Sequence, residues 1–97
     1  MDKRTYITIL YDYYGELFKE HQRAYFEDYY FQNFSLGEIS ENYGVSRNAV
    51  HKTIKNIEQK LKFCEEKLKL YEKSLQLDDI IKEVKDANIK QKLELLR

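Results

Sequence analysis

Apolar side chains recur every three or four residues through the first third of the chain, which is the spacing of one helix face. The first such series consists of Tyr6, Ile9, Leu10, Tyr13 and Leu17. It predicts a helix over about residues 2–18, loosened at Gly15. A second, aromatic-rich series predicts a helix over residues 20–31. Because each ring offers a large area to bury, we interpret these aromatic side chains as core.

Residues 35–54 have the layout of a helix-turn-helix. Ser35 is a good N-cap, and Glu38 follows three residues later to complete a capping box. The short helix predicted over residues 36–42 ends at Gly44, where a left-handed residue is needed. Ser46 then caps a helix that begins at Arg47. An ordinary corner between two helices would show similar signals and stays an alternative.

A heptad pattern without interruption runs from residue 50 to residue 75. Its members are Val50, Ile54, Ile57, Leu61, Cys64, Leu68, Tyr71 and Leu75. One helix carrying this pattern would be about 37 Å long, which exceeds the needs of so small a domain. The apolar seam formed by Ile57, Leu61, Cys64, Leu68, Tyr71 and Leu75 therefore needs a covering surface. The N-terminal helices can cover its early part, and the rest is left for the C-terminal segment or for a second copy. We expect a second copy, which predicts a homodimer.

The last 22 residues favour two short helices that fold back. Asp78 or Asp79 is a candidate cap for the first, and residues 86–88 are a candidate break before the second. The predicted fold is thus an all-α, helix-turn-helix bundle with a long C-terminal helix. We expect residues 1–60 to form the helix-turn-helix domain and residues 61–97 to pack on it as an extension.

Charge divides the chain into two halves although the formal net charge is zero. Residues 1–45 carry 4 basic and 8 acidic side chains, whereas residues 46–97 carry 13 basic and 9 acidic ones. Residues 46–62 alone have a net charge of +4. Such a local basic stripe can bind phosphate in a protein that is neutral as a whole. The alternative is a solvated helix face.

The residues show no catalytic apparatus. The three glycines do not form a phosphate-binding loop, and Cys64, His21 and His51 lack the paired spacing of metal ligands. We therefore expect a non-enzymatic protein with no metal and no cofactor. A single cysteine, interpreted as a packing residue, and the lack of a membrane-spanning apolar stretch indicate the cytoplasm.

Recognition is the remaining function, and the start of the second motif helix is suited to it. In a helix-turn-helix the N-terminal residues of this helix reach the base edges. Here they are Arg47, Asn48, His51, Lys52 and Lys55. Arginine can pair with guanine and asparagine with adenine, whereas lysine commonly contacts phosphate. His51 taken alone is better interpreted as an exposed bystander.

Longer stretches of the sequence resemble one family. The segment FSLGEISENYGVSRNAV at residues 34–50 is similar to the signature of the YlxM family. Residues 17–22, the pair Tyr29–Tyr30 and the charged continuation from Ile54 to Tyr71 extend the likeness. This resemblance implies a small bacterial helix-turn-helix protein, winged-helix-like or similar to region 4 of sigma factors. It also implies an accessory or regulatory role in the signal recognition particle pathway, with the particle's RNA or GTPases as partners.

Two main functions and one weaker alternative therefore stand after sequence analysis. The first is an accessory factor of the signal recognition particle that binds its RNA or protein. The alternative is a DNA-binding transcription regulator, and a protein-interaction scaffold is a third. The local basic helix supports nucleic acid over the scaffold, whereas overall neutrality counts mildly against tight binding of DNA alone.

Overall fold

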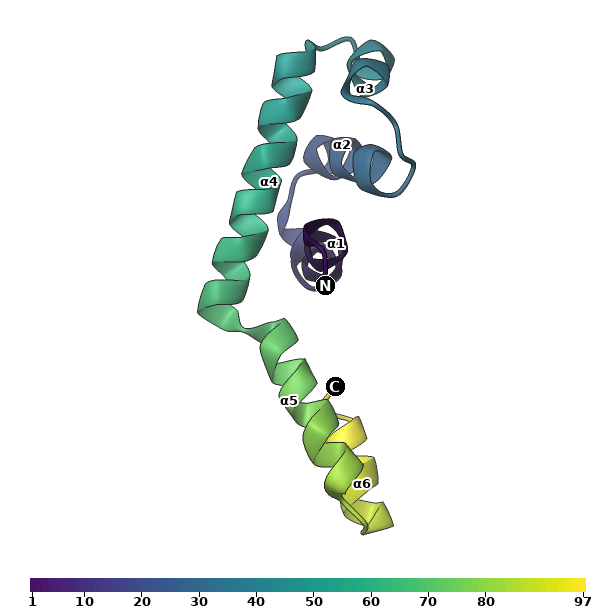
Figure 1. Ribbon diagram of the computed structural model, residues 1–97, viewed down its shortest axis with the longest axis vertical. Helices are drawn as coiled ribbons and strands as arrows, with labels where there is room; N and C mark the ends of the chain where they lie inside the picture. Colours follow the sequence, from purple (N-terminus) through teal and green to yellow (C-terminus); the bar gives the residue numbers. More distant parts are fainter.

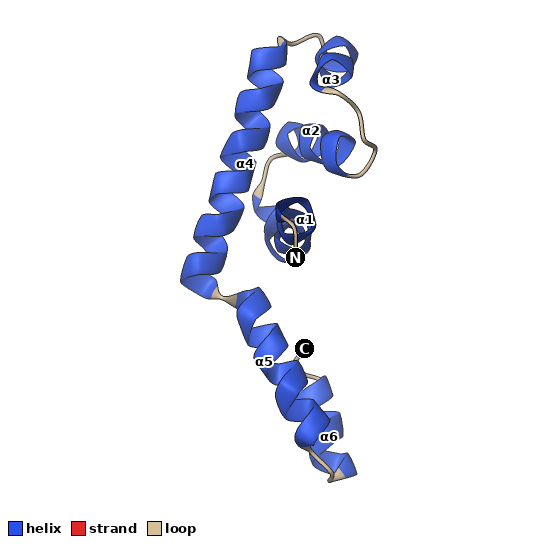
Figure 2. Ribbon diagram, viewed as in Figure 1, coloured by secondary structure: helices blue, strands red, loops and turns tan.

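The computed structural model describes residues 1–97 as an all-helical chain without strands (Figure 2). The elements are α1 (Lys3–Tyr14), the 3₁₀ turn η1 (Gly15–Leu17), α2 (Glu20–Tyr30), α3 (Leu36–Tyr43), α4 (Arg47–Leu68), α5 (Leu70–Glu83) and α6 (Ala87–Glu94). The predicted all-α class and helix-turn-helix bundle are confirmed, and the absence of strands means that the motif has no wing. The first predicted helix loosens at Gly15 as expected, where α1 passes into η1.

The long helix α4 contacts each of the three helices before it, and α1, α2 and α3 lie along one side of it (Figure 1). The core between them contains 14 buried residues. The ring of Phe26 lies at its centre, with ring centroids 4.2 Å from Tyr11 and 4.4 Å from Tyr30. These stacked rings confirm the interpretation of most early aromatic residues as core, whereas Tyr13 and Phe31 are exposed.

The remaining helices, α5 and α6, form a hairpin that projects beyond this core (Figure 1). We call this hairpin, residues 70–97, the arm. It stretches the molecule to 56 × 24 × 24 Å, with a radius of gyration of 17.3 Å. A compact domain of this length has a radius of gyration of about 13 Å. The arm therefore has little contact with the core except where α5 meets α1 and α4.

The long C-terminal helix is interrupted, and this corrects the sequence prediction. A single helix through Leu75 was expected from the heptad pattern, but α4 ends at Leu68 because Lys69 has a left-handed backbone with φ of 56°. Asp78 and Asp79 do not begin a helix either, since they lie inside α5. The break predicted at residues 86–88 is confirmed, because the Asp86 carboxylate caps α6 at the amides of Asn88 and Ile89.

A pair of side chains from outside α5 explains the bend at Lys69. The Glu65 carboxylate accepts hydrogen bonds from the Tyr14 hydroxyl (2.6 Å) and from the amides of Tyr71 (3.1 Å) and Glu72 (3.0 Å). The Tyr14 hydroxyl in turn accepts a hydrogen bond from the amide of Leu70 at 3.1 Å. Three free amides at the start of α5 are thereby satisfied by α1 and α4. We call the Tyr14–Glu65 pair the latch.

Candidate nucleic-acid interface

The turn between α3 and α4 is fixed at both ends. Ser35 and Glu38 form the predicted capping box: the Ser35 hydroxyl accepts a hydrogen bond from the Glu38 amide at 3.1 Å, and the Glu38 carboxylate accepts one from the Ser35 amide at 3.0 Å. The bond from the Ser35 amide holds the pKa of the Glu38 carboxyl below its usual value. At the other end, Gly44 ends α3 in the left-handed conformation with φ of 66°, as the sequence predicted.

Two serines hold the next turn of backbone. The Ser40 hydroxyl donates to the carbonyl of Val45, and the Val45 amide donates to the carbonyl of Ser40. The Ser46 hydroxyl accepts the Ala49 amide at 3.0 Å, so Ser46 is the predicted N-cap of α4. Because the start of α4 is set by a cap, the directions of the side chains that follow are set as well.

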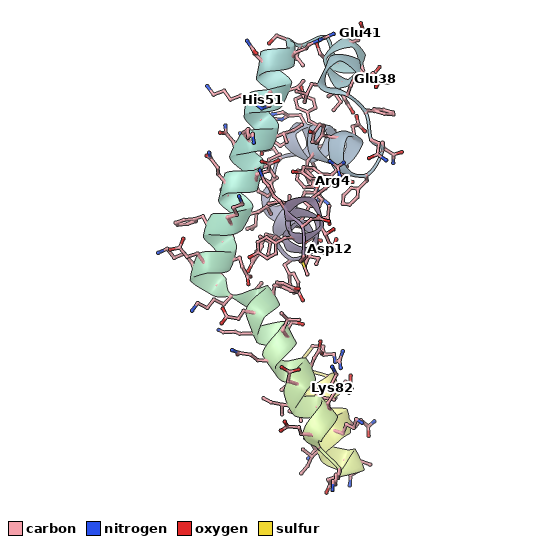
Figure 3. All side chains as sticks on the ribbon, in the orientation of Figure 1. Arg4, Asp12, Glu38, Glu41, His51 and Lys82 are labelled. Atoms are coloured by element: carbon pink, nitrogen blue, oxygen red, sulfur yellow. The ribbon has the colours of Figure 1, made fainter.

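The five predicted contact residues lie on the exposed part of α4. Val50 and Ile54 of the same helix are buried in the core, with exposed fractions of 0% and 3%. The exposed set consists of Arg47, Asn48, His51, Lys52 and Lys55. Figure 3 shows His51 on the half of α4 that lies near α3, far from Lys82 on the arm. The structure thus brings the predicted residues together in about two turns of one helix.

The side chain of Arg47 lies against the other helix of the motif, α3. Its guanidinium lies over Gly37 of α3, so that a Cβ atom added to Gly37 would be 2.7 Å from one terminal nitrogen and 3.0 Å from Cζ. Glycine at residue 37 therefore makes room for the arginine head group. Its backbone conformation is one that other residues also adopt. This contact between the two helices of the motif was not foreseen from the sequence.

Lys55 has an acidic neighbour that was also not foreseen. The Glu58 carboxylate is buried, with an exposed fraction of 6%, and lies 3.5 Å from the Lys55 ammonium and 3.7 Å from the Lys3 ammonium. It also accepts a hydrogen bond from the Tyr30 hydroxyl. Glu58 and Glu65 each follow a buried seam residue directly, but so does the exposed Lys62, so this position in the sequence does not indicate which residues turn inward.

The predicted seam divides between two environments. Ile57, Leu61 and Cys64 are buried in the core, with exposed fractions of 0%, 0% and 8%. Tyr71 is half-buried against that core, whereas Leu68 and Leu75 remain about half exposed on either side of the bend. Ile57, Leu61 and Cys64 thus pack against the chain's own helices, whereas Leu68 at the end of α4 does not.

The structure holds no group of three or more histidine, cysteine, aspartate or glutamate side chains arranged around a metal position. No helix combines the length and the apolar character that crossing a membrane requires. The five predicted contact residues lie on the exposed start of α4, which the capped turn holds against α3. This is the architecture of a helix-turn-helix protein.

Comparison with known proteins agrees with this class. The model of the UPF0122 family, the YlxM / p13 like helix-turn-helix proteins, matches residues 1–96, and the chain belongs to this family. A relative from Halalkalibacterium halodurans is 43% identical over 91 residues, covering 94% of this chain and 84% of the relative. One from Malacoplasma penetrans is 39% identical over 87 residues, covering 90% and 81%.

Some relatives are considerably longer than the matched region. The relative from Thermoanaerobacter sp. strain X514 is 47% identical over 62 residues, which cover 64% of this chain and 53% of the relative. The match thus spans about half the length of that protein. The resemblance to the YlxM family is confirmed by these findings.

Proposed function

We propose that this protein binds nucleic acid through the start of α4. The observation that carries this proposal is the exposed set of Arg47, Asn48, His51, Lys52 and Lys55 on a helix whose start is fixed by Ser46. In this arrangement α4 enters a groove, and its first two turns face base edges and phosphates. Glu58, whose carboxylate lies 3.5 Å from the Lys55 ammonium, is turned into the core rather than exposed on this surface.

Within this function we propose an accessory role in the signal recognition particle pathway, in the cytoplasm and without catalysis. Membership of the YlxM / p13 like family supports the role, because the resemblance implied it. The partner would be the particle's RNA, with its GTPases as protein partners. We further propose that the protein acts as a homodimer, since a two-fold pair of helix-turn-helix motifs contacts two sites at once.

A transcription regulator that binds duplex DNA is the second candidate. The capped, single recognition helix favours it, because this geometry suits a major groove. RNA duplexes have a deep and narrow major groove that side chains do not read in the same way. Binding to particle RNA would therefore involve an irregular or widened region of its structure.

The test is a charge change on the proposed contact surface. Lys52→Glu combined with Lys55→Gln should weaken binding and reduce the slope of log affinity against log salt by about 2, because two phosphate contacts are lost. Glutamine is chosen at residue 55 because a glutamate there would repel the buried Glu58 carboxylate. Fluorescence anisotropy is measured with signal recognition particle RNA and with random duplex DNA over a range of salt concentrations.

The matched control is Lys85→Glu combined with Lys90→Gln, which makes the same charge change at exposed positions of the arm. It should leave affinity and salt slope near those of the unchanged protein. Preference for the particle RNA supports the accessory role, and preference for duplex DNA supports the regulator. Absence of binding to either at low salt would reject the nucleic-acid function and leave the protein-interaction scaffold.

A further inference from the structure

The predicted seam does not offer a second copy much surface. Ile57, Leu61 and Cys64 are occupied by α1 and α2 in the core of the same chain. A dimer formed through these three residues would have to open that core. If two copies associate, their contact surface therefore lies elsewhere.

The arm carries an unusual share of exposed apolar side chains. Six of the 13 exposed large apolar side chains of the protein belong to it, whereas Ile81 is its one fully buried residue. The six are Leu70 (42% exposed), Leu75 (47%), Ile80 (51%), Ile89 (51%), Leu95 (81%) and Leu96 (72%). Single exposed apolar residues are ordinary, but a concentration of them marks an interaction surface. A hairpin of two helices also has too few neighbours to bury an apolar stripe by itself.

Part of this surface is concave. A groove where α1, α5 and the C-terminal residues meet is lined by Tyr13, Leu70, Leu77 and Leu96, with Lys73, Ser74 and Arg97 completing it. Arg97 is held there by Asp78 at 3.0 Å and by Glu94 at 2.9 Å. Of the two charged residues beside the apolar lining, Arg97 is therefore already paired within the arm.

Charge indicates what kind of partner fits the arm. Residues 70–97 contain six basic and six acidic side chains, so the arm is neutral. A nucleic acid or a strongly charged protein would gain little from this surface. A second copy of the same neutral surface meets no net repulsion.

The latch favours association because it fixes the direction of the arm. Because Tyr14 and Glu65 hold the start of α5 through hydrogen bonds of 2.6 to 3.1 Å, the arm leaves the core in a fixed direction. A surface that is ordered in advance loses less conformational entropy on binding. The start of α4 lies at the opposite end of the molecule and stays free (Figure 1).

We propose that the arm is a docking surface for a second copy of this chain, whose own arm packs against it. The apolar groove and the exposed leucine and isoleucine side chains of both arms are covered in the contact. This proposal rests on the homodimer named in the proposed function and deepens it, and it does not depend on nucleic-acid binding.

The test is the molar mass of the full chain by light scattering and analytical ultracentrifugation at micromolar concentrations. The unchanged protein should have twice the chain mass of 11.8 kDa. Leu96→Glu and Ile80→Glu, each at a residue at least half exposed, should return it to the mass of one chain. Circular dichroism checks that both variants keep the helical content of the unchanged protein.

Phe63→Glu is the matched control, because Phe63 is 57% exposed on α4 outside the arm. It should leave the dimer intact. A monomeric unchanged protein would overturn the proposal, and so would a dimer that Phe63→Glu separates and the arm variants do not. Nucleic-acid binding is measured in parallel: Lys52→Glu with Lys55→Gln should remain dimeric. The failure of the dimer and the failure of nucleic-acid binding are thereby distinguished.

Discussion

At the scale of single residues, the position of Arg47 depends on the absence of a side chain at residue 37. A Cβ atom there would lie 2.7 Å from the guanidinium, so the arginine head group would have to move. Alanine otherwise favours a helix over glycine by about 1 kcal/mol. We therefore expect Gly37→Ala to keep or raise thermal stability while it lowers nucleic-acid affinity. Thermal denaturation and fluorescence anisotropy measure the two effects separately.

A double-mutant cycle with Arg47→Ala shows whether Gly37 acts through the arginine. Once the guanidinium is gone, Gly37→Ala should have no further effect on affinity. An equal loss of affinity with and without Arg47 would contradict this account, because it would mean that the backbone of α3 makes the contact. The cycle needs no knowledge of the bound sequence.

At the scale of elements, α5 begins without a cap of its own, since Lys69 makes no side-chain hydrogen bond there. The latch supplies the partners instead. Tyr14→Phe removes both the donor to Glu65 and the acceptor of the Leu70 amide. We expect it to lower the free energy of unfolding by about 1–3 kcal/mol, because buried polar groups lose their partners. Hydrogen exchange should become faster in the first turn of α5.

Tyr13→Phe is the control for this substitution. Tyr13 is the next residue along α1, is 40% exposed, and lies near α5 through its ring rather than its hydroxyl. It should leave both the free energy of unfolding and the exchange rates in α5 unchanged. Equal effects of the two substitutions would mean that ring packing, and not the latch, holds the start of α5.

The latch also marks the limit of what sequence could predict about the elements. The caps at Ser35 and Ser46 and the turn at Gly44 are local signals, and from them the helix-turn-helix and the exposed face of α4 follow. The bend at Lys69 is different, because the Tyr14 hydroxyl and the Leu70 amide that meet there are 56 residues apart. Nothing local distinguishes Lys69 from the heptad around it. The Gly37–Arg47 contact likewise needed the crossing of two helices.

Sequence also could not locate the start of the last helix, because several residues were equally good N-cap candidates. Asp78, Asp79 and Asp86 are all acceptable N-caps in the same stretch, and only Asp86 caps a helix. Ile81 lies three residues after Asp78 and is buried, so continuing α5 past the first two aspartates keeps this side chain covered. Packing thus decided between caps that sequence alone could not rank.

At the scale of the whole molecule, two buried tyrosine–carboxylate pairs join α4 to the N-terminal helices. Tyr14 binds Glu65, and Tyr30 binds Glu58. Burial first, and then the hydrogen bond to the carboxylate, raises the pKa of Tyr14 to about 12 and also raises the pKa of Tyr30. Both pairs need the tyrosine protonated, since an ionised phenolate would face a carboxylate in the core.

This linkage predicts a loss of stability in alkali. An unfolded tyrosine titrates near pH 10, so the unfolded chain releases these protons before the folded one does. The stabilising effect is complete below pH 10 and is lost as the pH rises from about 10 through 12. Each such tyrosine steepens the fall of the unfolding free energy by at most about 1.4 kcal/mol per pH unit. Urea unfolding of the unchanged protein between pH 8 and pH 11.5 measures this slope.

The Tyr14→Phe variant isolates the contribution of Tyr14 to this slope. It should start less stable at pH 8 and then lose stability less steeply than the unchanged protein, so that the two curves converge as the pH rises. Tyr13→Phe keeps both buried pairs and should follow the unchanged protein throughout. Parallel curves for Tyr14→Phe and the unchanged protein would show that Tyr14 ionises at its ordinary pKa, and that burial beside Glu65 does not couple it to folding.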